Sequence, residues 1–166
     1  MAVDTSIIGK PTGARKVRVE RGPVEFFATS LKDGNPVYHD AVAAAAAGFD
    51  GVPAPPTFSF VMSHMGARAE EQPPDPSGGH NPMFKAMGEL MQKGGLVLHG
   101  EQEFVYHRPI VEGDVLHSEG RIVDAYEKES KGSIMTFFVM ETVWRDESDA
   151  PVVTETFNLI HRRKAE

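Results

Sequence analysis

The amino-acid sequence predicts an α+β fold in which an antiparallel sheet of long strands wraps around one long central helix. Two observations support this class. Helical segments and turns fill the first half of the chain, whereas long strand-like segments fill the second half. In addition, a stretch that begins at Phe58 is apolar on nearly all sides, which is typical of a helix buried on every face.

Length and composition indicate one globular domain over residues 1–166. Cysteine is absent, which excludes disulfides, thiol catalysis and Cys-ligated zinc. The formal net charge of −7 disfavours nucleic-acid binding. No apolar run approaches the roughly 18–20 residues that cross a bilayer, and residues 1–10 lack the pattern of a signal peptide. We therefore expect a cytoplasmic protein without nucleic-acid or membrane partners.

The first half of the chain consists of short elements separated by strong turn signals. Residues 15–20 alternate charge and valine, which predicts a strand. Pro23 suits the first turn of the next helix, where its missing N–H costs nothing. Residues 32–36 predict a turn. Asp40 is a predicted N-cap for a helix over residues 41–47.

The predicted central helix follows a stiff, proline-rich approach and is capped by Thr57. Its apolar side chains are those of Phe58, Val61, Met62 and Met65. Residues 70–81 are dense in proline and glycine, which predicts an exposed loop. Residues 82–92 then predict a short amphipathic helix with a stripe of methionines.

The second half predicts four strands bounded by turn residues, over 95–108, 114–127, 133–146 and 152–162. The third strand is apolar on both faces, so both faces must be covered. The central helix covers one face, and a partner subunit or the Met-rich helix covers the other. A meander of long strands around one apolar helix predicts a hot-dog fold.

Several motifs then resemble one family in their order and spacing. Residues 104–116 resemble the strand–turn–strand signature of MaoC-like dehydratases, and residues 33–40 resemble the hydratase motif of that family. Residues 49–58 resemble the approach to its central helix. Residues 98–104 are similar to the accessory subunit of heteromeric 3-hydroxyacyl dehydratases.

The resemblance implies a dimer of hot-dogs that binds an acyl-CoA or acyl-carrier-protein thioester at the subunit interface. It also implies reversible hydration of a trans-2-enoyl thioester, without a cofactor or a metal ion. That reaction needs an acid and a base, and a donor that polarises the thioester carbonyl. In the family, an Asp and a His five residues apart do the acid–base work, and a backbone N–H at the start of the central helix polarises the carbonyl.

Asp33 matches the catalytic Asp, but the residue five positions later is Tyr38, and the histidine follows as His39. The resemblance makes Asp33 and His39 the candidate catalytic residues, provided that the loop adjusts by one residue. Alternatively, Asp33 shapes a turn and His39 lies exposed, or His39 serves a partner's site. Tyr38 is a candidate substrate contact.

The glycine that carries the carbonyl donor in the family falls at Pro56, which has no N–H. Thr57 could supply its N–H or hydroxyl instead, or the two prolines only stiffen the approach. We include Pro56 and Thr57 among the candidate substrate-binding residues. Both departures favour a subunit that keeps the fold and works beside a catalytic partner.

Three further features have both a functional and a plain interpretation. His99, Glu101 and Glu103 share one face if their strand is regular, which predicts a polar cluster near the ligand entrance or dimer interface, with His99 as a substrate contact, rather than a metal site. The methionine stripe of residues 83–91 forms either a wall for a bulky acyl chain or ordinary core. The basic residues 161–164 either meet CoA phosphates or are solvated.

The leading hypothesis is therefore a subunit of an enoyl-thioester hydratase, or (3R)-hydroxyacyl-thioester dehydratase, that forms a heterodimer with a catalytic MaoC-like subunit. The second hypothesis is a self-sufficient homodimeric hydratase that uses Asp33 and His39. A non-catalytic acyl-thioester-binding or assembly module is the third, and a hot-dog thioesterase is a weaker fourth.

Overall fold

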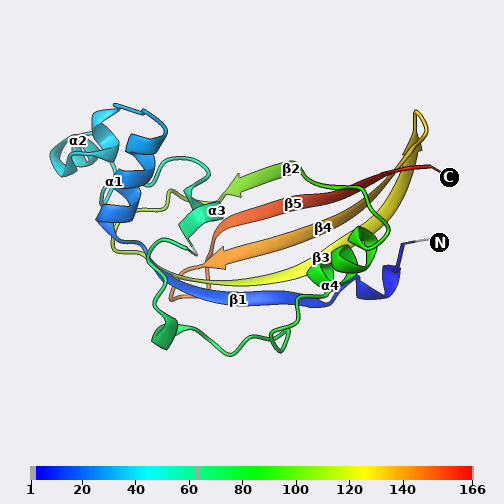
Figure 1. The fold of residues 1–166 in the computed structure, drawn as a ribbon. Coiled ribbons are helices and arrows are strands. Elements are labelled where there is room, and N and C mark those ends of the chain that lie inside the picture. The colour runs from blue at the N-terminus through cyan, green and yellow to red at the C-terminus, as the bar shows by residue number, and fades with distance from the viewer. Residues whose placement is uncertain (1–2, 63, 166) are drawn as a thin grey trace.

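A computed structural model describes residues 3–62 and 64–165. One antiparallel sheet dominates the fold, with the strand order β1-β3-β4-β5-β2 (Figure 1). Its strands are β1 (Pro11–Arg18), β2 (Leu96–Tyr106), β3 (Val115–Ser130), β4 (Ser133–Arg145) and β5 (Pro151–Lys164). This sheet confirms the predicted α+β class and the hot-dog architecture.

Turn chemistry fixes the register of the long strands. Lys131 (φ 52°) and Gly132 (φ 71°) join β3 to β4, and two successive residues of positive φ are what a tight hairpin requires. Asp146 closes the next turn by accepting hydrogen bonds from the N–H groups of Ser148 (3.0 Å) and Ala150 (3.1 Å). Both predicted turns are therefore confirmed.

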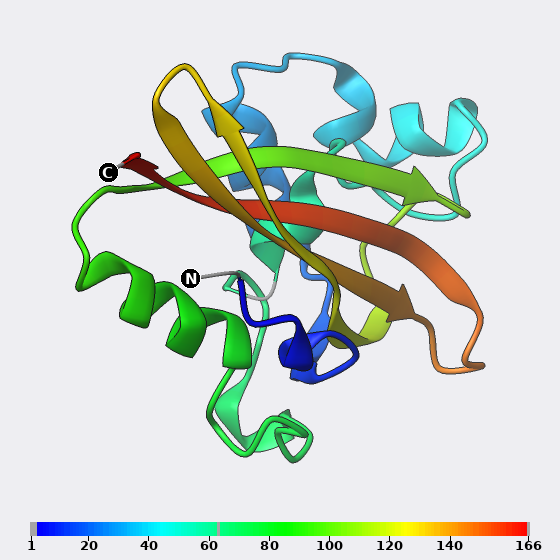
Figure 2. The same cartoon turned by 90° about the vertical axis from the view of Figure 1, so that its right-hand side faces the viewer.

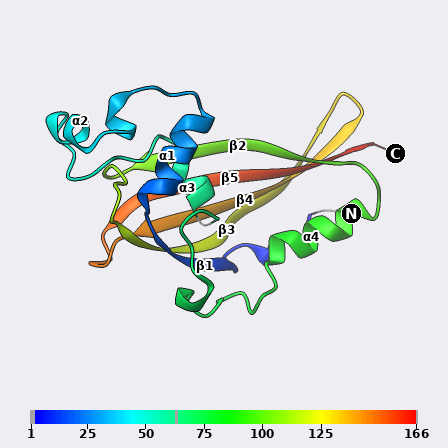
Figure 3. The same cartoon turned by 60° about the vertical axis from the view of Figure 1, so that its left-hand side comes forward.

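The helices lie at the two ends of the sheet. They are α1 (Arg21–Ser30), α2 (Ala41–Ala46), α3 (Phe58–Met62) and α4 (Pro82–Met91), with single 3-10 turns η1 (Thr5–Ile7), η2 (Pro36–Tyr38) and η3 (Ala69–Glu71). Figures 1 and 3 show the first three α-helices at one end and α4 at the other. Figure 2 views the molecule from the α4 end, where both termini lie.

The described residues do not contain the long central helix that the sequence predicted. The helix α3 has only five residues. Thr57 before it and Gly66 after it both have positive φ values, of 71° and 98°. A Cβ at Gly66 would lie 2.5 Å from the carbonyl oxygen of Arg18, so the chain passes too close to β1 for a continuing helix with ordinary side chains.

Two short helices, α3 and α4, therefore cover the sheet where the sequence predicted one long helix. Phe58 and Met62 of α3 belong to a buried cluster that includes Trp144 and Val153 of the sheet. Met83 and Met87 of α4 belong to a second cluster. Its other buried members are Ile7, Ile122, Ala125 and Phe138. Met83 and Met87 are thus core residues, whereas Met91 is 42% exposed.

Candidate functional site

The loop between α1 and α2 holds the candidate acid–base residues. The Asp33 carboxylate accepts a hydrogen bond from the Asn35 N–H at 3.0 Å. The Asn35 side chain in turn accepts one from the Val37 N–H at 3.2 Å and caps η2. These local bonds, which Asp and Asn make readily, shape the loop as the sequence predicted.

His39 folds back onto the same loop. Its Nε2 lies 2.8 Å from the main-chain oxygen of Asp33. Since a carbonyl oxygen only accepts, Nε2 carries the proton in this arrangement and Nδ1 is the basic nitrogen. Arg21 donates a hydrogen bond to the His39 carbonyl oxygen at 2.6 Å, which ties the loop to the start of α1. The ring is therefore oriented by the backbone of Asp33, not by its carboxylate.

Tyr38 occupies the position five residues beyond Asp33. Its pKa is raised, chiefly because burial disfavours the phenolate and secondarily because the Asp33 carboxylate is nearby. A phenol with a raised pKa stays protonated at neutral pH. Tyr38 can therefore donate or accept a hydrogen bond, but it cannot serve as the base of a hydratase.

Thr57, the second part of the site, stands at the start of α3. Its φ of 71° lies in the left-handed region, where a β-branched residue is strained and a glycine is favoured. The exposed Thr57 N–H donates to the Tyr106 hydroxyl at 2.9 Å. Pro56 directly before it is exposed and has no N–H to offer. Thr57 thus supplies the backbone donor at this position, and Tyr106 is a contact that the sequence did not single out.

His99 lies on the helix-facing side of β2, against α3. Its ring packs on Phe157 of β5 and Phe60 of α3, with centroid distances of 4.6 and 5.6 Å. The expected polar cluster with the two glutamates is wrong, because the register of β2 shifts between His99 and Gln102. Glu101 and Glu103 flank Gln102, which pairs with Phe157, so they point to the opposite face.

Among residues 3–62 and 64–165, no group of His, Asp and Glu is arranged to hold a metal ion. The described part of the chain also contains no helix long and apolar enough to span a membrane.

A clamp of charges fixes the turn between β2 and β3, within the family-like segment 104–116. Arg108 pairs with both carboxylate oxygens of Asp114, at 2.8 and 3.0 Å, and also approaches Asp146 at 3.5 Å. Asp114 additionally accepts from the Val111 N–H at 3.0 Å. The hydrogen bond to Asp114, which outweighs partial burial, raises the pKa of Arg108. This motif therefore has a structural role that holds the end of β2 and hence Tyr106.

The structure brings some candidates together and leaves others apart. Asp33, Tyr38 and His39 share one loop. Thr57 lies on the neighbouring element, and the rings of Phe27 and Phe58 join α1 to α3 at 5.6 Å. In the part of the chain that the structure describes, no hydrogen bond, ion pair or ring contact links His39 to Thr57.

The sequence pattern did not reveal one buried carboxyl group. Glu155 of β5 is only 7% exposed and accepts a hydrogen bond from the Trp144 indole at 3.2 Å. Burial raises the pKa of Glu155. The nearby Ser59 hydroxyl and the Trp144 indole oppose this shift, although the hydroxyl does not have the geometry of a hydrogen bond to the carboxylate. Alternation along a strand did not reveal it, because a glutamate between threonines resembles a solvent-facing residue.

Comparisons with known proteins agree with this fold. A UPF0336 protein of Saccharopolyspora erythraea is 32% identical over 169 residues, covering 100% of this chain and 96% of that protein. The ChsH1-ChsH2 complex of Mycobacterium tuberculosis contains a similar chain, with 26% identity, a TM-score of 0.72 and coverage of 94% of this chain and 86% of that chain.

The HadBC (3R-hydroxyacyl-ACP dehydratase) complex of the same organism has a similar fold, with 19% identity, a TM-score of 0.63 and coverage of 91% and 96%. Other solved structures of this fold are MaoC-like dehydratases. The fold and these neighbours define a hot-dog domain of the MaoC-like dehydratase type. Residues 6–155 match the family described as FAS1-like, dehydratase domain region, and the chain belongs to that family.

Proposed function

We propose that this chain is a subunit of an enoyl-thioester hydratase, or (3R)-hydroxyacyl-thioester dehydratase, and that it acts beside a catalytic MaoC-like partner. The observation that carries the proposal is Tyr38, a phenol with a raised pKa at the position where the family has its histidine. Without a base there, the acid–base pair of this loop is incomplete. A cytoplasmic location suits a chain that has no cysteine.

The part of the site that would bind the thioester carbonyl, formed by Thr57 and Tyr106, is more complete than the acid–base loop. The Thr57 N–H is exposed and already donates to an oxygen, that of Tyr106. A thioester carbonyl oxygen that took this place would accept the same N–H, and the Tyr106 hydroxyl would be free to donate to it as well. Two donors aimed at one oxygen stabilise the enolate-like charge that develops during hydration.

The two edges of the sheet differ in a way that favours a partner at β2. Edge strand β1 carries Arg15, Lys16 and Arg18, and such charges protect a strand from pairing. Edge strand β2 is instead open to solvent and apolar at both ends, with the exposed Glu101 and Glu103 in its middle. Its exposed apolar residues are Leu96 (62%), Val97 (40%), Leu98 (40%), Val105 (47%) and Tyr106 (44%). We propose that the catalytic subunit covers this edge.

The ChsH1-ChsH2 and HadBC neighbours, both complexes of different chains, support a heteromeric arrangement. The alternative, a self-sufficient homodimer, is favoured by one observation: the main-chain oxygen of Asp33 holds the ring of His39 through Nε2, which leaves Nδ1 as the nitrogen that can accept a proton.

The test is to assay hydration of crotonyl-CoA by the purified chain alone and by the chain co-expressed with a catalytic MaoC-like subunit. We expect activity only in the mixture, and we expect that activity to survive Asp33→Asn. Activity of the chain alone that disappears in Asp33→Asn or His39→Gln would replace the accessory role by the homodimer. Absence of both activity and thioester binding in every combination would refute the enzymatic proposal.

A further inference from the structure

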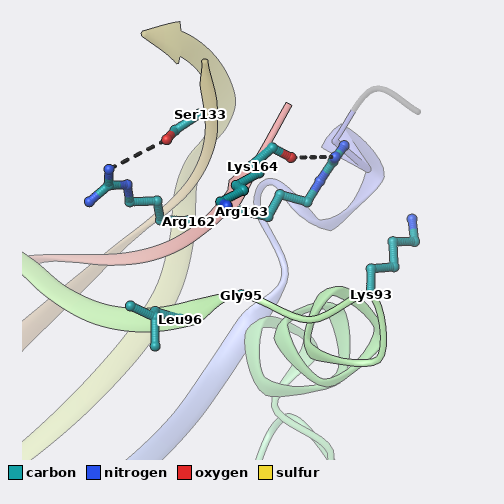
Figure 4. Close-up of a pocket in the computed structure, with 7 residues that line it drawn as sticks. All are labelled: Lys93, Gly95, Leu96, Ser133, Arg162, Arg163 and Lys164. Atoms are coloured by element: carbon teal, nitrogen blue, oxygen red, sulfur yellow. Dashed lines mark hydrogen bonds between the residues drawn. The ribbon is translucent and has the colours of Figure 1, made fainter. Parts of the chain in front are cut away.

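A basic cavity lies at the α4 end of the molecule, far from the site described above. It has a volume of about 820 Å³ and is bounded by the end of α4, the start of β2 and the end of β5 (Figure 4). Among the residues that the structure describes, its lining has four cationic side chains and no carboxylate: Lys93, Arg162, Arg163 and Lys164, with Gly95, Leu96 and Ser133 between them. The basic tail predicted from the sequence is thus the last part of β5.

Close packing of the backbone holds these cations in place. A Cβ at Gly95 would lie 2.5 Å from the Arg162 carbonyl oxygen, so the absence of a side chain lets the loop after α4 touch β5. The buried ring of His161 bonds the Gly94 carbonyl oxygen at 2.8 Å. Arg162 also donates to the Ser133 hydroxyl at 3.4 Å. The cavity wall is therefore part of the sheet, unlike a frayed terminus.

No carboxylate of the described residues forms an ion pair with the cations of the cavity. The whole chain is acidic, with a formal charge of −7. Four unpaired cations around one hollow repel each other, and a bound anion removes that repulsion.

The position of the cavity indicates which acyl site it serves. β2 has 11 residues and so separates the cavity from Tyr106 by roughly 35 Å along the strand. A two-fold or pseudo-two-fold pair of hot-dogs joined at β2 would have these strands antiparallel. The start of β2 in this chain would then lie beside the end of the partner's edge strand, next to the partner's catalytic site.

We propose that this cavity binds the phosphate groups of coenzyme A while the acyl part of the same thioester occupies the partner's catalytic site, an inference that rests on the proposed function. Arg162 and Arg163 point to opposite sides of β5 (Figure 4), and each can match phosphate oxygens with its own paired N–H donors. The exposed Leu96 offers an apolar surface to the rest of the nucleotide. The cavity size is within the range of about 300–1,000 Å³ for small-molecule sites. The substrate is accordingly CoA-linked, not carrier-protein-linked.

The first test measures binding by the chain alone at low salt, with CoA and with pantetheine, which lacks the nucleotide and its phosphates. We expect CoA to bind more tightly than pantetheine. Lys93→Gln/Lys164→Gln and, separately, Arg162→Gln should each weaken CoA binding by about tenfold, through the loss of charge-assisted contacts. Lys16→Gln/Lys32→Gln, which removes two charges elsewhere, is the control and should bind like the wild type.

Equal binding of CoA and pantetheine, or equal loss in the cavity and control variants, would overturn the inference. Circular dichroism and thermal unfolding of each variant establish that it folds, and Lys93→Gln/Lys164→Gln alters no hydrogen bond made by a side chain of the described residues.

The second test uses the complex with the catalytic subunit and separates this inference from the proposed function. The cavity variants should raise the KM for crotonyl-CoA by about tenfold, leave kcat unchanged, and leave the KM for crotonyl-pantetheine unchanged. A complex that is inactive with both substrates contradicts the proposed function. A complex that is active, but in which the variants affect both substrates equally or prefer an acyl-carrier-protein thioester, contradicts the cavity assignment alone.

Discussion

The backbone N–H of Thr57 and the hydroxyl of Tyr106 meet at 2.9 Å although they are 49 residues apart in the sequence. This bond joins the start of α3 to the end of the edge strand β2. It places an exposed donor and a second hydroxyl side by side, on an edge that we propose to be covered by a partner.

Tyr106→Phe tests whether the hydroxyl contributes to catalysis. In a self-sufficient homodimer, where the thioester would react at this chain's own site, Tyr106→Phe should lower kcat on the order of 10²-fold, the usual effect of removing one donor to a developing oxyanion. In the heteromeric complex, where the partner's site carries out the reaction, kcat should not change. Thermal unfolding should change little, because both groups are exposed. Tyr126→Phe, on a ring stacked against Phe137 at 4.7 Å, is the matched control and should retain full activity. Equal activity of both variants would remove Tyr106 from the mechanism.

Thr57→Gly tests the strain at the start of α3. Because φ is 71° at this position, glycine should relieve strain and stabilise the fold by about 0.5–1 kcal/mol while keeping the N–H. Urea unfolding measures the change. Thr29→Gly in the last turn of α1 should instead destabilise the protein by about 0.3–0.5 kcal/mol, since glycine has a lower helix propensity than threonine. Destabilisation by both substitutions would show that the Thr57 side chain makes compensating contacts.

Glu155 makes the stability of the fold depend on pH. Its pKa is raised in the folded protein, so the folded state binds the proton more tightly than the unfolded chain does. This contribution is fully present below the unfolded pKa of about 4.3, and it is lost as the pH rises through the folded pKa.

The free energy of unfolding, measured with urea between about pH 4 and pH 8, should therefore decline toward high pH. Glu155→Gln should flatten this decline. The exposed Glu147→Gln is the control and should keep the wild-type profile. An unchanged profile in Glu155→Gln would mean that another group is responsible.

The clamp between Arg108 and Asp114 is expected to stabilise the turn that ends β2. Asp114→Asn should cost about 1–2 kcal/mol in the free energy of unfolding, because a partly buried guanidinium loses its two-point partner. The exposed pair Arg121–Glu141, at 2.8 Å, provides a comparison for which Glu141→Gln should cost about 0.5 kcal/mol or less. Similar costs at both pairs would contradict the special role of the clamp.

Local patterns in the sequence were sufficient for the sheet but not for the central helix. Strand alternation and hairpin chemistry at Lys131 and Gly132 are short-range signals, and they predicted the strands and turns correctly. The end of α3 depends instead on the contact of Gly66 with Arg18, 48 residues away in the chain by their numbering. An apolar run alone could not reveal it.

In the candidate site too, short-range features could be predicted from the sequence and long-range contacts could not. The cap formed by Asp40 follows from a short-range rule, and the sequence predicted it correctly. The bulge in β2, by contrast, separates His99 from Glu101, and the partner of Thr57 comes from a distant strand. Both depend on how strands pair, which a single sequence does not specify locally.

The difference between the two sheet edges also affects how readily an unassembled copy aggregates. An open apolar strand is a template on which further strands can add, whether they belong to the correct partner or to another unfolded chain. In a free copy, the exposed apolar ends of β2 thus offer sites for such addition that the β1 edge, with its cationic side chains, does not share. The fraction of the free chain that stays in solution should fall as its concentration rises. Coproduction with the chain that covers β2 should restore it.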